Sequence, residues 1–438
     1  MSLRERVELA QGRVDPRSEK PGFLLLRRQV QEILPPEKLA AMTEESPLRA
    51  RSEVMRACMR AFDGPEWVLV GEGERSALAG EVVDSVFGFG PLEELLSDPT
   101  VTEVMVNGPS RVFFEREGKL HPSSQKFASE DQLRALIDRI LGPLGRRVDE
   151  ASPMVNARLP QGHRVHVVMP PLSLVGPVLT IRKFSERVYT LDDLAEMGAL
   201  DGEMRVFLTW SILMRKNIAV SGGTGSGKTT LLNAMSCEIP PDERIITIED
   251  SAELRFLEHP HVVSLEARPE NSEGRGLVTI RDLVINALRM RPDRIVVGEC
   301  RGAEALDMLQ AMSTGHDGSL TTLHANSPEE VVSRLTTMVR YSADLPVDVV
   351  EANVASALDL VVQTSRAPDG SRFVSQVSEI GYSLEQRQCV LSTLFKRGVL
   401  DKAGVWVGEP RWLEGVVDFG FGTTEEVEEW RSRAFCSQ

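Results

Sequence analysis

Cysteine pairs, aromatic side chains and long apolar runs are all scarce in this chain of 438 residues. The five cysteines are scattered and form no Cys-x-x-Cys pair, which argues against a disulfide framework and against a zinc site. We interpret them as reduced thiols of a cytoplasmic protein. No segment reaches the ~18 apolar residues of a membrane-spanning helix. Charges interrupt the N-terminal segment where a signal peptide would need an apolar core. We therefore expect a protein that reaches a membrane only through partners.

Basic charge is also in deficit. The chain has 50 Lys and Arg residues against 65 Asp and Glu residues, which gives a formal net charge of −15. Broad, non-specific nucleic-acid binding depends on the neutralisation of phosphates by basic side chains. An acidic balance does not favour this mode of binding, so we do not expect a nucleic-acid partner.

The first 185 residues divide by pattern into two parts. Residues 1–75 combine a polar segment at 1–20, typical of a disordered arm, with apolar residues that then recur at helical spacing. Residues 76–185 begin as a helix and continue with alternating strand patterns, among which Asn107-Gly108-Pro109 marks a hairpin. We predict a small helical module over 1–75 and an α+β domain over 76–185.

Strand and helix patterns alternate after a predicted linker at Ser185–Tyr189. Short β-branched strands separated by helices predict an α/β domain over 186–384, with a mostly parallel sheet covered by helices. The predicted strands are 217–221, 244–249, 294–298 and 319–324, and the predicted helices are 229–235, 279–289, 303–312 and 328–340. The tail, 385–438, has three of the five tryptophans and an acidic run. It either docks a partner or packs on the α/β domain, and we expect packing.

A glycine-rich loop follows the first of these strands. Its sequence fits G-x-x-x-x-G-K-[ST], between an apolar strand and a helix, which is the context that a phosphate-binding loop requires. Glycines let backbone N–H groups approach phosphate oxygens, and the helix N-terminus favours an anion. A lysine then reaches the β- and γ-phosphates and a hydroxyl reaches Mg²⁺. The loop and the first helical turn comprise Gly222, Gly223, Thr224, Gly225, Ser226, Gly227, Lys228, Thr229 and Thr230.

Two carboxylates at the ends of apolar strands are candidates for catalysis. Arg294–Glu299 reads as a buried strand that ends in an acid, and Glu299 beside a phosphate loop can contact Mg²⁺ or activate the attacking water. Glu249 closes another apolar strand, and strand ends in open α/β sheets converge on the ligand crevice. For Glu249 a helix-capping or turn role is an equal alternative. No pattern indicates an acceptor-hydroxyl site, so we predict hydrolysis rather than a kinase reaction.

Two histidines flank the predicted strand 319–324. His316 precedes this Thr-rich strand and His324 ends it. A single histidine is usually structural, whereas two around one short strand suggest phosphate sensing. Their spacing does not indicate a metal site.

Four segments occur in an order that resembles the type II/type IV secretion ATPases. They are similar to the Walker A, Asp box, Walker B and His box motifs of that superfamily. The segments are Gly222–Thr230, Thr247–Leu254, Arg289–Glu299 and Gly315–Asn326. Four ordered motifs are far more specific than one phosphate loop.

Upstream segments resemble the CpaF-like branch that assembles tight-adherence (Tad, type IVc) pili. These segments are Gly90–Leu96, Val104–Pro109, Arg147–Pro153 and Leu159–His166, so that the resemblance covers roughly 80–384. The tetracysteine zinc motif of some type II secretion motors is absent. The resemblance implies a homohexameric ring in which a PAS-like α+β domain precedes a RecA-like ATPase domain. It implies ATP and Mg²⁺ as cofactors and inner-membrane platform proteins as partners. It also implies a peripheral place at the cytoplasmic face of the inner membrane.

The resemblance also implies roles for single residues. Lys228 and Thr229 hold phosphates and Mg²⁺, Glu299 is the Walker B acid, Glu249 the Asp-box acid and His324 the His-box sensor. Arg164 and Arg182 match positions from which the N-terminal domain reaches the phosphates. Domain closure would then couple chemistry to motion, because a guanidinium stabilises charge on the phosphates and lets go when phosphate leaves. Arg289 and Arg291 either act similarly or cap the segment before the Walker B strand.

Three alternatives stay open from the sequence. One is a RecA-like motor driven by nucleic acid, which predicts a basic channel that the net charge disfavours. Another is an ATPase of a type IV secretion system that exports protein or DNA. The third is a scaffold that binds ATP without turnover, which the joint presence of Lys228 and Glu299 disfavours. The sequence does not distinguish extension of a filament from its retraction.

Overall fold

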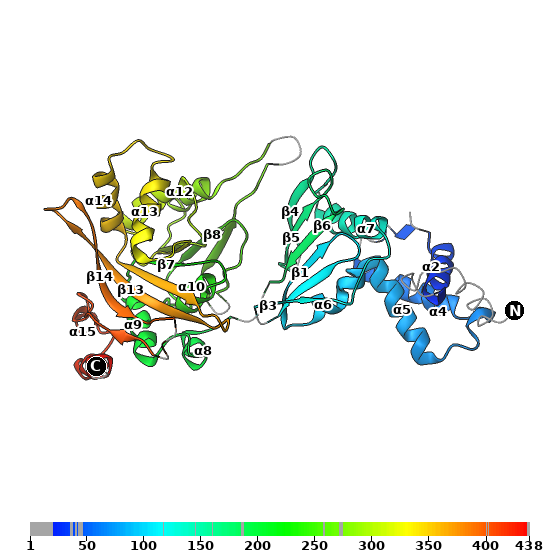
Figure 1. Cartoon of the computed structure of the whole chain (residues 1–438), viewed down its shortest axis with the longest axis horizontal. Helices are drawn as coiled ribbons and strands as arrows, with labels where there is room; N and C mark the ends of the chain where they lie inside the picture. The colour runs from blue at the N-terminus through cyan, green and yellow to red at the C-terminus, as the bar shows by residue number, and fades with distance from the viewer. Residues whose placement is uncertain are drawn as a thin grey trace. The chain divides into compact units, whose positions relative to one another are not determined.

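Two compact units make up the chain, Met1–Phe184 and Ser185–Gln438 (Figure 1). The structure is a computed structural model that describes residues 21–35, 38–39, 42, 47–116, 118–144, 146–159, 161–184, 188–256, 259–270, 275–399, 401 and 403–435. The predicted arm at 1–20 and most of the predicted linker lie outside these residues. No helix in the described ranges is long and apolar enough to cross a bilayer.

Three helices open the first unit, α2 (Pro21–Ile33), α4 (Pro47–Ala61) and α5 (Glu72–Phe87). The first two lie where apolar residues recur at helical spacing. Helix α5 carries the helical part to Phe87, beyond the predicted boundary at residue 75. The reason is packing, because Leu78, Val82 and Val83 of α5 join the same apolar cluster as Leu26 and Trp67.

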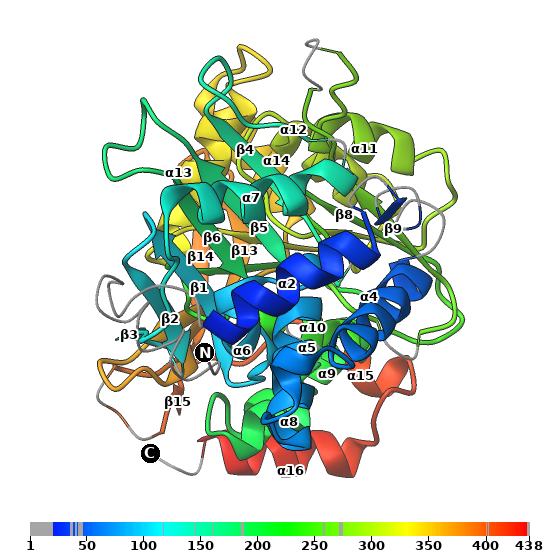
Figure 2. The same cartoon turned by 90° about the vertical axis from the view of Figure 1, so that its right-hand side faces the viewer.

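A six-stranded antiparallel sheet forms the rest of this unit, in the order β3-β2-β1-β6-β5-β4. Its strands are β1 (Val101–Asn107), β2 (Val112–Arg116), β3 (Lys119–Pro122), β4 (Met154–Arg158), β5 (Arg164–Val168) and β6 (Val178–Arg182). Helix α7 (Glu130–Leu141) lies across one face of the sheet, as Figure 2 shows, and the short α6 (Glu93–Ser97) precedes β1. Buried Leu133, Leu136 and Ile137 of α7 share a cluster with Val165 and Leu179 of the strands.

The second unit has a mixed nine-stranded sheet, in the order β15-β14-β13-β12-β7-β11-β10-β8-β9. Six strands from β12 to β9 run parallel, and β13 to β15 extend one edge antiparallel. Four of the parallel strands, β7, β8, β10 and β11, lie where the alternating pattern predicted them, and β9 and β12 are additional. The strands are β7 (Ile218–Gly222), β8 (Ile245–Glu249), β9 (Val262–Glu266), β10 (Arg294–Val297), β11 (Leu320–Leu323), β12 (Leu360–Arg366), β13 (Arg372–Ser383), β14 (Gln388–Lys396) and β15 (Val405–Trp406).

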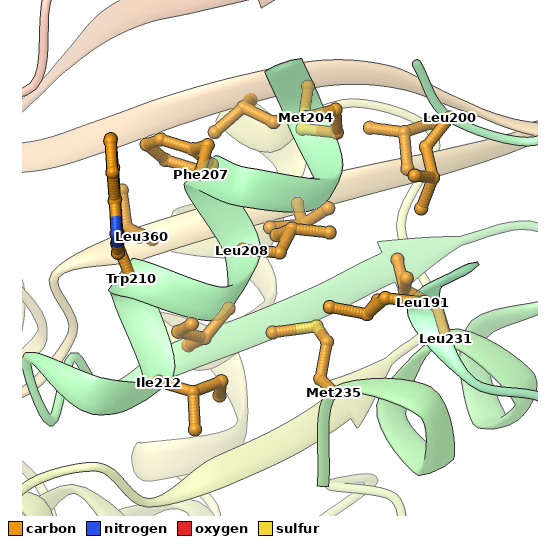
Figure 3. Packing of buried hydrophobic residues seen from close by; sticks show 14 of the residues in the cluster. Leu191, Leu200, Met204, Phe207, Leu208, Trp210, Ile212, Leu231, Met235 and Leu360 are labelled. Atoms are coloured by element: carbon orange, nitrogen blue, oxygen red, sulfur yellow. The ribbon is translucent and has the colours of Figure 1, made fainter. Parts of the chain in front are cut away.

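Helices cover both faces of this sheet. Ile218 and Val220 of β7 face a cluster with α8 (Leu191–Glu196), α9 (Gly202–Leu213), α10 (Lys228–Ser236) and α16 (Thr424–Phe435). Figure 3 shows Met204, Phe207 and Leu208 of α9 in this cluster, above Leu231 and Met235 of α10. Ala219, which lies between Ile218 and Val220 in β7, faces a second apolar cluster on the other side of the sheet. That cluster includes residues of α11 (Ile280–Ala287), α12 (Glu304–Ser313), α13 (Pro328–Val339) and α14 (Val347–Ala357).

The segment 385–438 is continuous with this unit. Strand β14 pairs with β13 across the predicted boundary at residue 384, and β15 pairs with β14. After the short α15 (Gly415–Asp418), helix α16 returns to α9, where Trp430 Nε1 donates a hydrogen bond to the carbonyl of Glu203 at 2.9 Å. The tail therefore packs on the sheet and on α9.

Asn217, which is 3% exposed, fixes the start of the central strand β7. Its Nδ2 donates to the carbonyls of Met312 (3.2 Å) and Ala357 (2.8 Å), and its Oδ1 accepts from the N–H of Ser319 (2.9 Å). One side chain thus ties the ends of α12 and α14 and the start of β11 to the strand that leads into the phosphate loop.

We predict that Asn217→Ala lowers the free energy of unfolding of the second unit by about 3 kcal/mol, because it leaves buried carbonyls and an N–H without partners. Urea denaturation followed by tryptophan fluorescence measures this, since four of the five tryptophans lie in this unit. The exposed Asn286 on α11 provides the matched control, and Asn286→Ala should change stability by less than about 0.5 kcal/mol. Equal effects of the two substitutions would contradict the role given to Asn217.

Candidate functional site

The phosphate-binding loop lies between β7 and α10, at the carboxyl end of the parallel strands. Gly222 ends β7, Lys228 begins α10, and Gly223–Gly227 form the turn between them. Gly225 and Gly227 have φ of +70° and +96°, a left-handed conformation that side chains disfavour. Gly227 is also the N-cap of α10. The loop therefore presents backbone N–H groups and a helix N-terminus on the same side, as an anion site requires.

Lys228 is buried at the centre of the site, with 7% of the residue exposed. Its Nζ donates to the carbonyls of Gly222 (3.0 Å) and Gly223 (2.9 Å) and lies 3.3 Å from Nδ1 of His324. Burial lowers the pKa of Lys228, while the nearby carboxylate of Glu299 raises it and Arg301 lowers it. The ammonium group is thus held at the mouth of the phosphate loop by backbone oxygens.

His324 lies between Lys228 and Glu299. Its Nε2 is 3.2 Å from Oε1 of Glu299, on the side of the ring opposite Lys228. Because an ammonium group can only donate, we assign Nδ1 as the acceptor and place the proton of the neutral ring on Nε2. Burial, and then the charge of Lys228, lower the pKa of His324, while the carboxylate of Glu299 raises it, and the net shift favours the neutral ring. The ring therefore links the lysine of the phosphate loop to a carboxylate from another strand.

Glu299 follows β10, and its two carboxylate oxygens have different surroundings. Oε2 accepts a hydrogen bond of 2.6 Å from Nη2 of Arg301, which raises the pKa of this arginine. Oε1 is buried beside Nε2 of His324, at 3.2 Å, and accepts no hydrogen bond from the described residues. One oxygen of Glu299 is thus held by Arg301, and the other faces the imidazole ring of His324.

A cavity of about 300 Å³ borders the carboxylate of Glu299. It is lined by Glu299, Cys300, Arg301, His324, Arg334 and Met338. Sequence reasoning missed both of its arginines. Arg301 lies two residues after Glu299, a position that the motif order could have indicated, whereas only the packing of α13 brings Arg334 here.

Glu249 ends β8, as predicted, and is 4% exposed. Its Oε1 accepts hydrogen bonds from the N–H groups of Glu253 (2.9 Å) and Leu254 (3.1 Å), so that it closes the turn after the strand. Its side chain also packs against Gly298, where an added Cβ would lie 2.6 Å from Cγ of Glu249. The carboxylate thus contacts the residue that precedes Glu299.

Three predicted sensor residues lie near the amino ends of the parallel strands, away from the phosphate loop. His316 precedes β11, and its Nδ1 is 3.2 Å from the carbonyl of Ala311. Arg289 donates to the carbonyl of Ile285 at the end of α11, and Arg291 lies in the turn before β10. Since β10 and β11 run parallel to β7, these residues lie at the opposite ends of the strands from Lys228 of the same chain.

Arg164 and Arg182 belong to the first unit, where they are opposite each other on β5 and β6. Arg158 of β4 is opposite Arg164 in turn, so that three arginines form one row across the sheet. Like charges directly opposite in a sheet are destabilising. On its other side Arg182 is opposite Glu103 of β1, so that a carboxylate continues the row.

The chain matches the family model "Type II/IV secretion system protein" over residues 86–390. It is 38% identical over 341 residues to a protein of Mycobacterium tuberculosis provisionally named a conjugal transfer protein, covering 76% of this chain and 96% of the relative. It is 34% identical over 320 residues to the type IV secretion system protein VirB11 of Brucella suis, and the match covers 66% of this chain and 89% of that relative.

Among solved structures, the VirB11 ATPase of the Brucella suis type IV secretion system, in complex with sulphate, covers 69% of this chain and 96% of its own. It has 32% sequence identity and a TM-score of 0.37. These relatives have conjugal transfer and type IV secretion names, so they do not single out the tight-adherence branch. With the phosphate loop and the Glu299 strand in place, the chain belongs to the type II/IV secretion system protein family and is a secretion-type ATPase.

Proposed function

We propose that this chain is a Mg²⁺-dependent ATPase motor that drives the assembly of a pilus or secretion apparatus. The observation that carries the proposal is the continuous set of contacts from Lys228 through His324 to Glu299. It joins the residue that would bind the β- and γ-phosphates to the carboxylate that would position water. Binding alone would need only the loop, whereas a carboxylate that contacts His324 beside the loop lysine supports hydrolysis.

The proposed reaction is attack of water on the γ-phosphate. The N–H groups of the phosphate loop and the ammonium group of Lys228 stabilise the negative charge of the phosphates. Oε1 of Glu299 accepts a hydrogen bond from the attacking water and orients it, while Arg301 holds Oε2 and thereby the orientation of the carboxylate. His324 contacts both groups, which suits it to report the loss of the γ-phosphate.

The oxygen donors at the site suit Mg²⁺. Thr229 in the first turn of α10 offers a hydroxyl and Glu299 a carboxylate oxygen. Mg²⁺ usually takes one or two protein oxygens and fills its other positions with water and substrate phosphates. When bound, the ion would neutralise charge on the β- and γ-phosphates.

We propose a positioning role for Glu249. By closing the turn after β8 and packing on Gly298, it sets the path of the backbone into Glu299. We leave His316, Arg289 and Arg291 as candidates for contacts with a neighbouring subunit, because they lie away from Lys228 in their own chain.

The first unit would supply arginine side chains that contact the phosphates of the nucleotide. We propose that this PAS-like unit, through Arg164 and Arg182, closes on the RecA-like second unit and contacts the phosphates. The row of three arginines across β4, β5 and β6 supports this proposal. Contact of these guanidinium groups with the phosphates would couple nucleotide binding to closure.

The finer assignment is a homohexameric motor of the tight-adherence pilus branch, at the cytoplasmic face of the inner membrane, acting on platform proteins. The segments before residue 170 that resemble this branch support it. A type IV secretion ATPase is the second candidate, favoured by the names of the relatives. Genetic deletion distinguishes them, because the first predicts loss of pili and the second loss of export or conjugation.

We predict that Glu299→Gln lowers kcat for ATP at least about 100-fold, because the amide cannot accept the proton of water or orient it as the carboxylate does. Nucleotide affinity, measured with a fluorescent ADP analogue, should stay within about threefold, since the loop is unchanged. The exposed Glu329 on α13 provides the control, and Glu329→Gln should hydrolyse ATP at the wild-type rate. Hydrolysis unchanged by Glu299→Gln would refute the mechanism.

We predict that Arg164→Ala lowers kcat at least about tenfold without a loss of folded protein, because it removes a guanidinium group of the first unit that would stabilise charge on the phosphates. Steady-state ATP hydrolysis measures the effect. Arg134→Ala on α7, which breaks only an exposed ion pair with Glu130, is the control. Equal activity of the Arg164 variant and the wild type would rule out the coupling proposal.

We predict that the chain assembles into a particle of about 290 kDa, six times the 48.4 kDa of one subunit. Size-exclusion chromatography with light scattering, with and without ATP and Mg²⁺, measures the mass. A monomer under all conditions, at concentrations where ATP is hydrolysed, would contradict the ring.

A further inference from the structure

Three side chains outside the recognised motifs contact the phosphate loop from the neighbouring strands. They are Gln363 and Thr364 at the end of β12 and Arg372 at the start of β13. We name these three residues the loop brace. None of them was predicted from the sequence, and all belong to the hairpin formed by β12 and β13.

Arg372 holds the backbone of the loop directly. Its Nε donates a hydrogen bond of 2.9 Å to the carbonyl of Gly225. A carbonyl oxygen turned toward bound phosphate would repel it, whereas the N–H groups of the same loop attract it. Because Arg372 donates a hydrogen bond to the Gly225 carbonyl, it favours the loop orientation in which N–H groups face the phosphates.

Thr364 fixes both sides of the loop from a buried position. Its Oγ1 donates to the carbonyl of Ser221 at 3.0 Å and lies 2.8 Å from Oγ of Ser226. Ser226 in turn donates to the carbonyl of Gly223 at 2.9 Å. Thr364 and Ser226 are 4% and 3% exposed, so water does not compete for these bonds.

Gln363 connects Ser221, the residue before the loop, to the segment that follows His324. Its Oε1 accepts a short hydrogen bond from Oγ of Ser221, and its Nε2 donates to the carbonyl of Ala325 at 3.1 Å. The brace therefore contacts both parts of the site that meet at Lys228.

Two glycines of the loop, Gly222 and Gly227, lie close against the brace. A Cβ added to Gly222 would lie 2.5 Å from the backbone oxygen of Thr364, and one added to Gly227 would lie 3.3 Å from Cδ of Arg372. The glycines of the motif thus serve close packing against β12 and β13 as well as the approach of phosphate.

We propose that Gln363, Thr364 and Arg372 are positioning residues that hold the phosphate loop in its anion-binding conformation before nucleotide arrives. Loss of a brace contact would leave the loop able to adopt conformations that do not bind phosphate. Such a loss would weaken nucleotide binding and leave the rate of the chemical step largely unchanged. This inference rests on the proposed hydrolysis of ATP at the same site.

The test measures binding of a fluorescent ADP analogue, together with KM and kcat for ATP, in the full-length chain. Arg372→Ala should raise the dissociation constant and KM about tenfold, with kcat within about threefold. Thr364→Val, which keeps the shape of the side chain, should raise both about threefold or more. Arg372→Lys should recover part of the affinity, since an ammonium group can also donate to the Gly225 carbonyl.

Arg387→Ala is the matched control. Arg387 lies in the turn between β13 and β14, at the other end of the same strand, and pairs with Asp348. This variant should bind and hydrolyse as the wild type does.

A merely structural role would reduce the amount of folded protein, seen in urea denaturation, and would leave KM and the dissociation constant unchanged. If Arg372→Lys and Thr364→Val both keep the wild-type KM and dissociation constant, the proposal is overturned, even if Arg372→Ala fails to fold. Failure of the wild-type chain to bind the analogue or to hydrolyse ATP would instead refute the proposed function.

Discussion

The ammonium group of Lys228 is the point on which the rest of the second unit depends. A buried cation needs oxygen or nitrogen partners from several directions, and no single segment supplies them. Here the carbonyls come from the end of β7, the imidazole follows β11, and the carboxylate beyond the imidazole follows β10. Their convergence requires three parallel strands to end at the same level. The register of the parallel strands sets that level, and Asn217 fixes the start of β7 among them.

This dependence explains which parts of the molecule could be predicted from the sequence. The phosphate loop and the strands β7, β8, β10 and β11 are local patterns, and they occur where the spacing predicted them, whereas β9 and β12 were not predicted. The edge strands β3 and β4 escaped prediction because their side chains are largely exposed and do not alternate. The antiparallel strands beyond residue 372 also escaped, and with them the continuity of the tail with the sheet. Nothing in a local window distinguishes such strands from those of a separate domain.

The site residues were likewise predicted only in part. Lys228, Glu299 and His324 come together as the order of their motifs suggested, whereas His316, Arg289 and Arg291 lie at the opposite ends of the parallel strands. The loop brace could not be found from spacing, since Ser221 and Gln363 are 142 positions apart and meet only through the pairing of β7 with β12. A motif describes the residues that touch a ligand. The residues that shape the motif are placed by the topology of the sheet.

The buried Oε1 of Glu299 has a consequence for protein engineering. This oxygen accepts no hydrogen bond from the described residues, so that it contributes little to folding stability. Selection of variants for heat resistance alone would therefore not preserve Glu299. Variants that replace it would retain the nucleotide pocket, yet they would have lost the residue that we propose to orient water. A thermostable form of this motor is better sought in the apolar faces of the sheet, far from the end of β10.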